Sequence, residues 1–207
     1  GVEMSMSYTV LSRPRDRSFL TLSLRAAHNK NRVVKISDSM RAYNEKMDEM
    51  AESDSKLVTK YYDGVSMEAI WAVRSLGIDP ATGREIYLTK DGISTYEYRA
   101  EDMVVCGDKL PKLRGSFGVN LGYKGFALNV MCMYELGAKM YNETLVDRVE
   151  NVNMSYAVDK RVLEGRWQKP GDKVRFRSLK QVWDPEKQTY KVDEKTLATS
   201  RFVQRKN

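Results

Sequence analysis

The sequence predicts an all-β fold, in which antiparallel strands form part of a transmembrane β-barrel (a partial barrel) and carry long extracellular loops. Four segments alternate apolar and polar residues with a period of two, and one keeps this alternation for eleven residues. The connections between the segments are short and long in turn, as in outer-membrane barrels. We expect the whole chain, 1–207, to be part of one barrel domain.

The composition argues against several other classes of protein. A hydrophobic fraction of 42% beside 30% charged residues disfavours disorder, and no apolar run reaches the ~20 residues of a transmembrane helix. The net charge of +7 is scattered rather than gathered into a basic stripe, so we expect no nucleic-acid partner. Cys106 and Cys132 lack the spacing of metal ligands or of a disulfide scaffold, and they are too far apart along the strands to pair with each other.

The four predicted membrane strands lie near 2–11, 19–29, 114–123 and 126–137. The last alternates from Phe126 to Leu136, which fits the roughly 9–11 residues of a tilted membrane strand. A soluble sandwich also contains two-faced strands, so alternation alone leaves that fold open. The alternating apolar positions are Val2, Met4, Met6, Tyr8 and Val10; Leu20, Leu22, Leu24 and Ala26; Phe117, Val119, Leu121 and Tyr123; and Phe126, Leu128, Val130, Cys132, Tyr134 and Leu136.

The third and fourth strands are predicted to form a hairpin around the two-residue turn Lys124-Gly125. This register places every apolar pair on one face, and a slip of one residue would destroy the sorting. The facing pairs are Tyr123 with Phe126, Leu121 with Leu128, Val119 with Val130, Asn120 with Asn129, and Arg114 with Glu135.

The lengths of the connections predict which ends of the strands lie together. The short connections, 12–18 and 124–125, fall on one side of an up-and-down sheet, and the long regions near 30–113 and 138–205 fall on the other. Outer-membrane barrels have this asymmetry, with short periplasmic turns and long extracellular loops. A soluble sandwich has no reason for it.

The first long loop is predicted to hold a short helix, Ser37–Glu52, with Ser37 or Asp38 as its N-cap. Its apolar stripe should pack on the loop itself, with a partner-binding face as the alternative. The stripe consists of Met40, Tyr43, Met47 and Met50.

The same loop is predicted to contain a small hairpin, formed by Arg84–Thr89 and Ile93–Tyr98. The preceding Asp79–Gly83 segment superficially suggests a calcium loop, but it lacks alternating Asp/Asn ligands and is better explained as a tight turn. The sequence shows no nucleophile elbow, no Cys–His pair with an orienting group and no phosphate-binding glycine loop. We therefore expect no enzymatic activity, no cofactor and no metal site.

Several aromatic residues in the predicted loops are candidates for contact with a substrate or a partner. Their rings could stack on sugars, or they could form small cores within the loops. The candidates are Trp71, Tyr96, Tyr98 and Trp167.

Four motifs in this order resemble those of SusC/RagA-type TonB-linked outer-membrane proteins. They are Trp71–Gly83, Gly115–Gly118 with Tyr123–Phe126, Gly137–Asn142, and Arg166–Asp172. The resemblance implies a 22-stranded barrel with a plug in the outer membrane of a Gram-negative bacterium. It also implies import of glycans or peptides, energised through TonB, with a SusD-type surface lipoprotein as a lid.

The chain opens at Gly1 without a signal peptide, and we expect both ends to be cuts within a longer barrel protein. The plug, the contact with TonB and the remaining strands would then belong to the rest of that protein. Under this interpretation Arg114, Asn120, Asn129 and Glu135 face the lumen, and Val119, Leu121, Leu128 and Val130 face outer-membrane lipid. The alternative is a secreted β-rich glycan-binding module whose apolar faces form a sandwich core.

Overall fold

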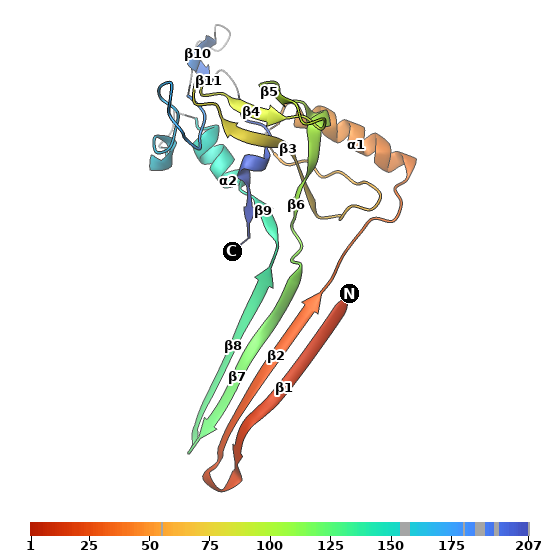
Figure 1. The fold of residues 1–207 in the computed structure, drawn as a ribbon, viewed down its shortest axis with the longest axis vertical. Helices are drawn as coiled ribbons and strands as arrows, with labels where there is room; N and C mark the ends of the chain where they lie inside the picture. The colour runs from red at the N-terminus through yellow and green to blue at the C-terminus, as the bar shows by residue number, and fades with distance from the viewer. Residues whose placement is uncertain (55, 154–157, 180, 185–188, 193–194, 207) are drawn as a thin grey trace.

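The computed structural model describes residues 1–54, 56–153, 158–179, 181–184, 189–192 and 195–206. The molecule is elongated: a narrow sheet of long strands extends from a wider unit in which the α-helices and the other strands gather (Figure 1). We call these two parts the long sheet and the loop unit, the latter comprising residues 30–112 and the described residues after 136. None of the helices in the described ranges is long and apolar enough to cross a membrane.

The long sheet is built from β1 (Val2–Arg13), β2 (Ser18–His28), β7 (Leu113–Tyr123) and β8 (Phe126–Leu136). Their order is β1-β2-β7-β8, and every neighbouring pair is antiparallel. The sheet is open, with β1 and β8 at its edges. The four predicted strands and the predominantly antiparallel β fold are confirmed, and the strand ends differ from the predictions by one or two residues.

The β7–β8 hairpin has the predicted register throughout, from Tyr123 opposite Phe126 to Arg114 opposite Glu135. Lys124 and Gly125 have φ angles of 47° and 95°. Positive φ at both central residues is what a type I′ turn requires, and its twist matches that of the flanking strands. Both short turns lie at the same end of the long sheet, opposite the loop unit (Figure 1).

The β1–β2 hairpin departs from simple alternation at one point. The register shifts between Thr9 and Leu11, so Val10 is the extra residue of a β-bulge. Leu11, opposite Leu20, therefore takes the apolar position that period two assigns to Val10. The connection is a short 3-10 turn, Pro14–Asp16, followed by Arg17 with φ 48°.

The loop unit contains a second four-stranded sheet, which the sequence did not predict. It is formed by β3 (Ala69–Ile78), β4 (Glu85–Leu88), β5 (Ser94–Thr95) and β6 (Met103–Asp108), in the order β5-β4-β3-β6. The expected hairpin is present as β4–β5, although β5 is only two residues long. The predicted small hairpin is therefore confirmed, and it lies at the edge of a larger sheet.

The first half of strand β3 escaped detection because both of its faces are buried. Its first five residues, 69–73, are all buried, so the segment shows no alternation with polar residues. Trp71 and Val73 pack in one apolar cluster with Met103 and Tyr87, whereas Ile70 packs in a second cluster. The second cluster draws its other members from later in the chain: Tyr141, Leu145, Val146, Val149, Val152, Val162, Phe176 and Phe202.

Helix α1 (Asp38–Ala51) begins where the sequence predicts, and the Ser37 hydroxyl accepts a bond from the Met40 N–H at 3.4 Å. Its buried side chains are Asn44 and Ala51, with Met47 packed beside them. Asn44 exchanges two hydrogen bonds with the Tyr61 backbone, at 2.6 and 2.9 Å. The predicted apolar stripe is only partly correct, because Tyr43 and Met50 are exposed.

After β8 the chain forms β9 (Lys139–Tyr141), which pairs with β12 (Val203–Arg205). Between them lie α2 (Glu143–Leu145), the π-helical turn Val146–Glu150, the 3-10 turn Lys160–Val162, β10 (Gln181–Asp184), β11 (Thr189–Val192) and the 3-10 turn Ser200–Phe202; an earlier 3-10 turn, Ala100–Asp102, precedes β6. Strands β10 and β11 pair only with each other within the described residues. Cys106 and Cys132 are both free, as predicted.

Candidate functional site

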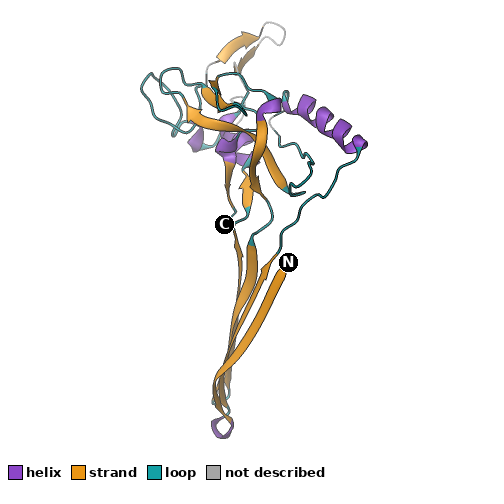
Figure 2. Ribbon diagram, turned by 45° about the vertical axis from the view of Figure 1, so that its right-hand side comes forward, coloured by secondary structure: helices purple, strands orange, loops and turns teal. Residues whose placement is uncertain are grey.

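The four long strands form one sheet (Figure 2). The two faces of this sheet differ chemically, and each takes residues from all four strands. Because side chains alternate along each strand, paired residues form rows across the sheet. The apolar rows are Tyr8, Leu22, Val119 and Val130; Met6, Leu24, Phe117 and Cys132; and Leu11, Leu20, Leu121 and Leu128. The polar rows include Thr9, Thr21, Asn120 and Asn129; and Glu3, Ala27, Arg114 and Glu135.

The apolar face is open to the surroundings. Val130 exposes 42% of its surface and Leu128 exposes 52%, although both lie well inside a paired strand. Val119 and Leu121, their partners on β7, are half-buried between neighbouring strands. A continuous exposed apolar face of this kind marks a surface that contacts another protein or a membrane.

The polar face carries the residues predicted to face a lumen. Arg114 lies opposite Glu135, Asn120 lies opposite Asn129, and the Thr9 and Thr21 hydroxyls are 3.4 Å apart on the same row. Close to the loop unit this face forms a shallow pocket of about 470 Å³ whose lining includes Glu3, Arg25, Arg114 and Met133. The four residues predicted to face a lumen therefore lie on one face of the sheet, opposite the apolar rows. They are Arg114, Asn120, Asn129 and Glu135.

Of the aromatic candidates, Trp71 lies in the core of the loop unit. Only 8% of its surface is exposed, and its indole N–H donates to the Lys60 carbonyl at 2.9 Å. Lys60 is itself buried and forms an ion pair with Asp48 on α1. The expectation of a substrate or partner contact at Trp71 does not fit this position, because the ring is used in packing.

Tyr98 is also mainly a packing residue. Its ring meets the Tyr87 ring edge-on with centroids 5.6 Å apart, and burial raises the pKa of its hydroxyl well above the ordinary value. Tyr96, by contrast, is 41% exposed, and its hydroxyl donates to Asp79 Oδ2 at 2.8 Å. The Arg84 guanidinium lies 5.0 Å from the centre of the Tyr96 ring.

Asp79 organises the predicted tight turn. Its carboxylate accepts bonds from the Thr82 hydroxyl at 2.7 Å and the Ala81 N–H at 2.9 Å, as well as from Tyr96. These bonds, the one from Thr82 most of all, lower the pKa of the Asp79 carboxyl below its usual range. Within the described residues, no group of three or more His, Cys, Asp and Glu side chains is placed to hold a metal ion.

Trp167 brings the second loop region onto this turn. Its indole N–H donates to the Pro80 carbonyl at 2.9 Å, and its ring covers Gly83, where an added Cβ would come within 2.5 Å of it. Gly83 also has a φ of 73°, so the position requires glycine for two reasons. Beside the ring is a pocket of about 520 Å³, lined by Leu163, Arg166, Leu179 and others.

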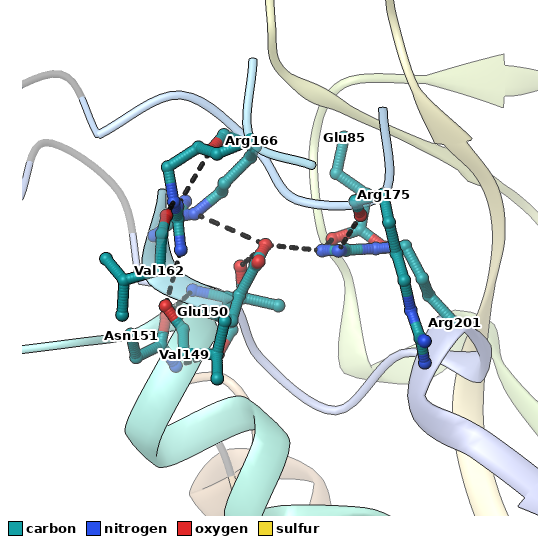
Figure 3. Close-up of polar contacts among 10 residues, drawn as sticks. Glu85, Val149, Glu150, Asn151, Val162, Arg166, Arg175 and Arg201 are labelled. Carbon is teal, nitrogen blue, oxygen red and sulfur yellow. Dashed lines mark hydrogen bonds and ion pairs between the residues drawn. The ribbon is translucent and has the colours of Figure 1, made fainter. Parts of the chain in front are cut away.

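A buried cluster of charges, absent from the sequence predictions, joins the two loop regions. Arg201 Nη2 donates to Glu85 Oε2 at 2.7 Å and to Glu150 Oε1 at 2.6 Å, and Arg201 Nη1 donates to the Arg175 carbonyl (Figure 3). Burial opposes the charge on Arg201, but the two carboxylates raise the pKa of its guanidinium above the ordinary value. The Thr196 hydroxyl adds a bond to Glu150 at 3.1 Å.

Arg166 completes the cluster by tying backbone segments together. Its guanidinium donates to the carbonyls of Val162, Arg177 and Val149 (Figure 3). Buried charges of this kind are stable only when they are paired or hydrogen-bonded. The cluster therefore joins the parts of the loop unit to one another.

Solved structures share this fold. The chain aligns with the RagAB peptide importer in its open-open state at a TM-score of 0.69 and 13% identity, over 98% of this chain and 20% of that chain. For the RagAB peptide transporter the TM-score is 0.70 at 13% identity, over 98% and 21%, and for the closed-closed state it is 0.68 at 14% identity, over 97% and 20%. The chain thus spans about a fifth of the length of the chains it matches.

No protein-family model matches the chain. No curated protein matches its sequence.

Proposed function

We propose that this chain is a wall segment, with its extracellular loops, of a SusC/RagA-type outer-membrane importer for peptides or glycans. Its long sheet would separate membrane lipid from a transport lumen. The surrounding protein would supply the other strands, the plug and the contact with TonB. The loop unit would lie outside the membrane, where a SusD-type surface lipoprotein could bind it.

The observation that carries this proposal is the exposed apolar face of the long sheet. In a soluble sandwich, residues such as Leu128 and Val130 would be covered by a second layer of protein. Within the described residues the loop unit packs beyond the ends of these strands instead of over their face (Figures 1 and 2). Long strands with one apolar face and one polar face are typical of barrels whose apolar face contacts lipid.

The polar face supports a transport role. It combines the Arg114–Glu135 pair with the Asn120–Asn129 pair and with Met131 and Met133, which are 58% and 84% exposed. Such a mixture of charges, amides and flexible thioethers can contact peptides of varied sequence without strong preference. The likeness to the fold of RagAB, whose structures are described as those of a peptide importer, supports the same assignment.

The loop unit offers surfaces for a partner or substrate at Tyr96 and Trp167. Tyr96 is exposed beside Arg84, and Trp167 lines a pocket about 520 Å³ in volume. Fully or partly exposed aromatic rings at such positions are common anchors in protein interfaces. The charge cluster around Arg201 would keep these surfaces in fixed positions relative to each other.

The membrane placement can be tested by site-directed labelling of the complete protein in liposomes, with Cys106 and Cys132 replaced by Ser. Single cysteines at Leu128, Asn129, Val130 and Met131 carry a fluorophore, and a quencher confined to the bilayer is added. We expect quenching at Leu128 and Val130 and little at Asn129 and Met131. Protection of both faces would mean that the apolar face packs on protein, and would favour the secreted glycan-binding module.

The same variants test transport. A bulky, charged, membrane-impermeant thiol reagent attached at Asn129 should reduce uptake of a labelled peptide mixture, because it would protrude into the lumen. The matched control is the cysteine at Val130, which the reagent should not reach. Uptake that is unaffected by modification at Asn129 would argue against a transport path along the polar face.

A further inference from the structure

A pocket of about 580 Å³ lies where the long sheet meets the loop unit. We call it the rim pocket. It is lined by the end of β2 and the segment after it, residues 28–32, and by parts of 64–66 and 105–112. The register of β2 places His28 on the same face as Leu22, Leu24 and Ala26. The rim pocket therefore begins at the edge of the apolar face, where that face reaches the loop unit.

The lining of the rim pocket is rich in cations and hydrogen-bond donors. Lys30 and Arg32 line it beside the amides of Asn29 and Asn31. Among the described residues neither cation forms an ion pair. The single carboxylate in the lining is Asp108, whose Oδ1 already accepts the Leu110 N–H at 2.9 Å. The rim pocket thus has an excess of positive charge without an internal partner.

The walls of the rim pocket are held in place from both sides. His28 Nδ1 lies 2.5 Å from the Lys112 carbonyl oxygen, which fixes the end of β2 against the start of β7. The Val33 N–H donates to the Val65 carbonyl at 2.9 Å, and the Gly64 N–H donates to the Val33 carbonyl at 2.8 Å. The short segment that carries Lys30 and Arg32 is therefore anchored at each end, which lowers the entropic cost of binding a ligand.

Part of the wall is apolar. Val65, Val105, Leu110 and Pro111 also line the rim pocket. Lys112 lies at its margin, with its stem against Gly137, where an added Cβ would be 3.0 Å from Lys112 Cγ. A site that combines cations and amides with aliphatic groups fits a molecule that has an anionic head and an apolar body.

We infer that the rim pocket binds the phosphate-bearing headgroup of an anionic lipid in the outer leaflet. The inference rests on the proposed membrane placement, which puts the end of β2 at the boundary between hydrocarbon and water. Lipid phosphates lie at this depth, and basic side chains next to a membrane surface attract them. The acyl chains of the bound lipid would extend along the exposed apolar rows that begin directly below the rim pocket.

The bland alternative is a solvated basic surface that binds nothing. Such a surface needs neither a concave site nor an anchored backbone, and both are present around Lys30 and Arg32. Free phosphate is a second source of the same anionic group, but it would not use the aliphatic wall formed by Val65 and Pro111. A lipid therefore accounts for both the cationic and the aliphatic residues of the lining.

The test is calorimetric titration of the complete protein in a neutral detergent with short-chain dihexanoyl phosphatidic acid. Dihexanoyl phosphatidylcholine and inorganic phosphate are titrated in parallel. The variant is Lys30→Gln with Arg32→Gln, and the matched control is Lys46→Gln with Lys90→Gln, which removes two exposed cations elsewhere in the loop unit. Circular dichroism verifies that both double variants are folded.

We expect the Lys30/Arg32 variant to bind phosphatidic acid about tenfold more weakly or worse, and the control to bind as the unmodified protein does. The affinity should fall with added salt, and phosphatidylcholine and inorganic phosphate should bind more weakly. Equal affinity of the two double variants would overturn the site. Inorganic phosphate binding as tightly as the lipid would overturn the lipid as its ligand.

Failure of this inference can be distinguished from failure of the proposed function. Quenching at Leu128 together with unchanged lipid binding in the Lys30/Arg32 variant would refute lipid binding at the rim pocket. The proposed barrel-wall function would still stand. Exclusion of the quencher from both faces would refute the membrane placement, on which the barrel-wall function and the lipid site both depend.

Discussion

Val130 in the middle of β8 keeps 42% of its surface exposed, whereas Val73 in the middle of β3 keeps 1%. Both lie in antiparallel strands of four-stranded sheets. The loop unit covers its strands with its own apolar clusters, so its folding can be driven by burial within the chain. The long sheet leaves its apolar rows uncovered and depends on its surroundings.

The two regions also differ in how far their charged side chains are buried. In the long sheet, Glu135 lies on an open face, and its exposed carboxylate pairs with Lys206 at 3.3 Å. In the loop unit, Glu150 has no exposed surface and is compensated by Arg201. Exposed ion pairs contribute little, whereas breaking a buried pair is costly. Substitutions of charge in the long sheet should therefore change stability through contact with solvent or lipid. In the loop unit they should change stability through the loss of buried ion pairs.

The strongest test of this comparison is expression of the 207-residue chain by itself. In water its exposed apolar rows and the unpaired edges of β1 and β8 should cause aggregation, which detergent should relieve. Size-exclusion chromatography with and without detergent measures this. A sharp monomer peak with cooperative thermal unfolding in plain buffer would contradict the dependence of the long sheet on lipid.

In the loop unit, Arg201→Ala should have the largest effect of any single substitution. It leaves Glu85 and Glu150 buried without their main partner, which typically costs about 3–5 kcal/mol. Hydrogen exchange of the complete protein should show loss of protection around β4 and α2, with the long sheet unchanged. Arg205→Ala, at an exposed position, is the matched control and should have almost no effect.

In the long sheet, neighbouring residues should differ sharply in their tolerance of charge. Val130→Arg in the complete protein should cost about 2–4 kcal/mol near the bilayer midplane, because Val130 would face hydrocarbon. Asn129→Arg should be nearly neutral, because Asn129 would face the watery lumen. Unfolding of the protein in liposomes by urea measures both. Equal costs at the two positions would mean that the faces do not differ in their surroundings.

The long sheet could be predicted from the sequence because its two faces meet different surroundings. Alternation fixed the strands near 114–123 and 126–137, and the register followed from the turn at Lys124-Gly125. The bulge at Val10 could not be predicted, because a single extra residue leaves most of the alternation intact. Which face meets lipid also remains a prediction from the sequence.

The fold of the loop unit is harder to predict from the sequence, because residues that contact each other in it lie far apart along the chain. The first half of strand β3 is buried on both faces and shows no period of two, so the sequence alone places Trp71 in a loop. The pairing of Arg201 with Glu85 joins residues 116 positions apart, and no local pattern reveals it. By contrast, the turn at Asp79 and the N-cap at Ser37 depend on neighbouring residues and were predicted correctly.

A smaller effect is expected at the start of α1, which covers one side of the loop unit. Ser37→Ala removes the hydroxyl that accepts the Met40 N–H and should cost about 1 kcal/mol. The loss should appear as faster hydrogen exchange at the first turn of α1 only. Ser39→Ala, which removes an exposed hydroxyl inside the helix, is the control and should not speed exchange.

The smallest expected effect is the pH dependence of the Asp79 turn. The bonds from Thr82, Ala81 and Tyr96 favour the ionised carboxylate, so the folded pKa lies below the ordinary value of about 4. A depressed carboxyl pKa stabilises the fold above the unfolded pKa, and this stabilisation is lost as the pH falls through the folded pKa. The turn should therefore be fully protected between about pH 5 and 7 and loosen below about pH 4. Hydrogen exchange of the segment 79–84, compared at each pH with an Asp79→Asn variant, isolates the contribution of this carboxyl. The difference between the two proteins should shrink as the pH falls below 4, while the long sheet shows no matching change. A difference that stays constant from pH 7 to pH 3 would show that Asp79 holds the turn by shape rather than by charge.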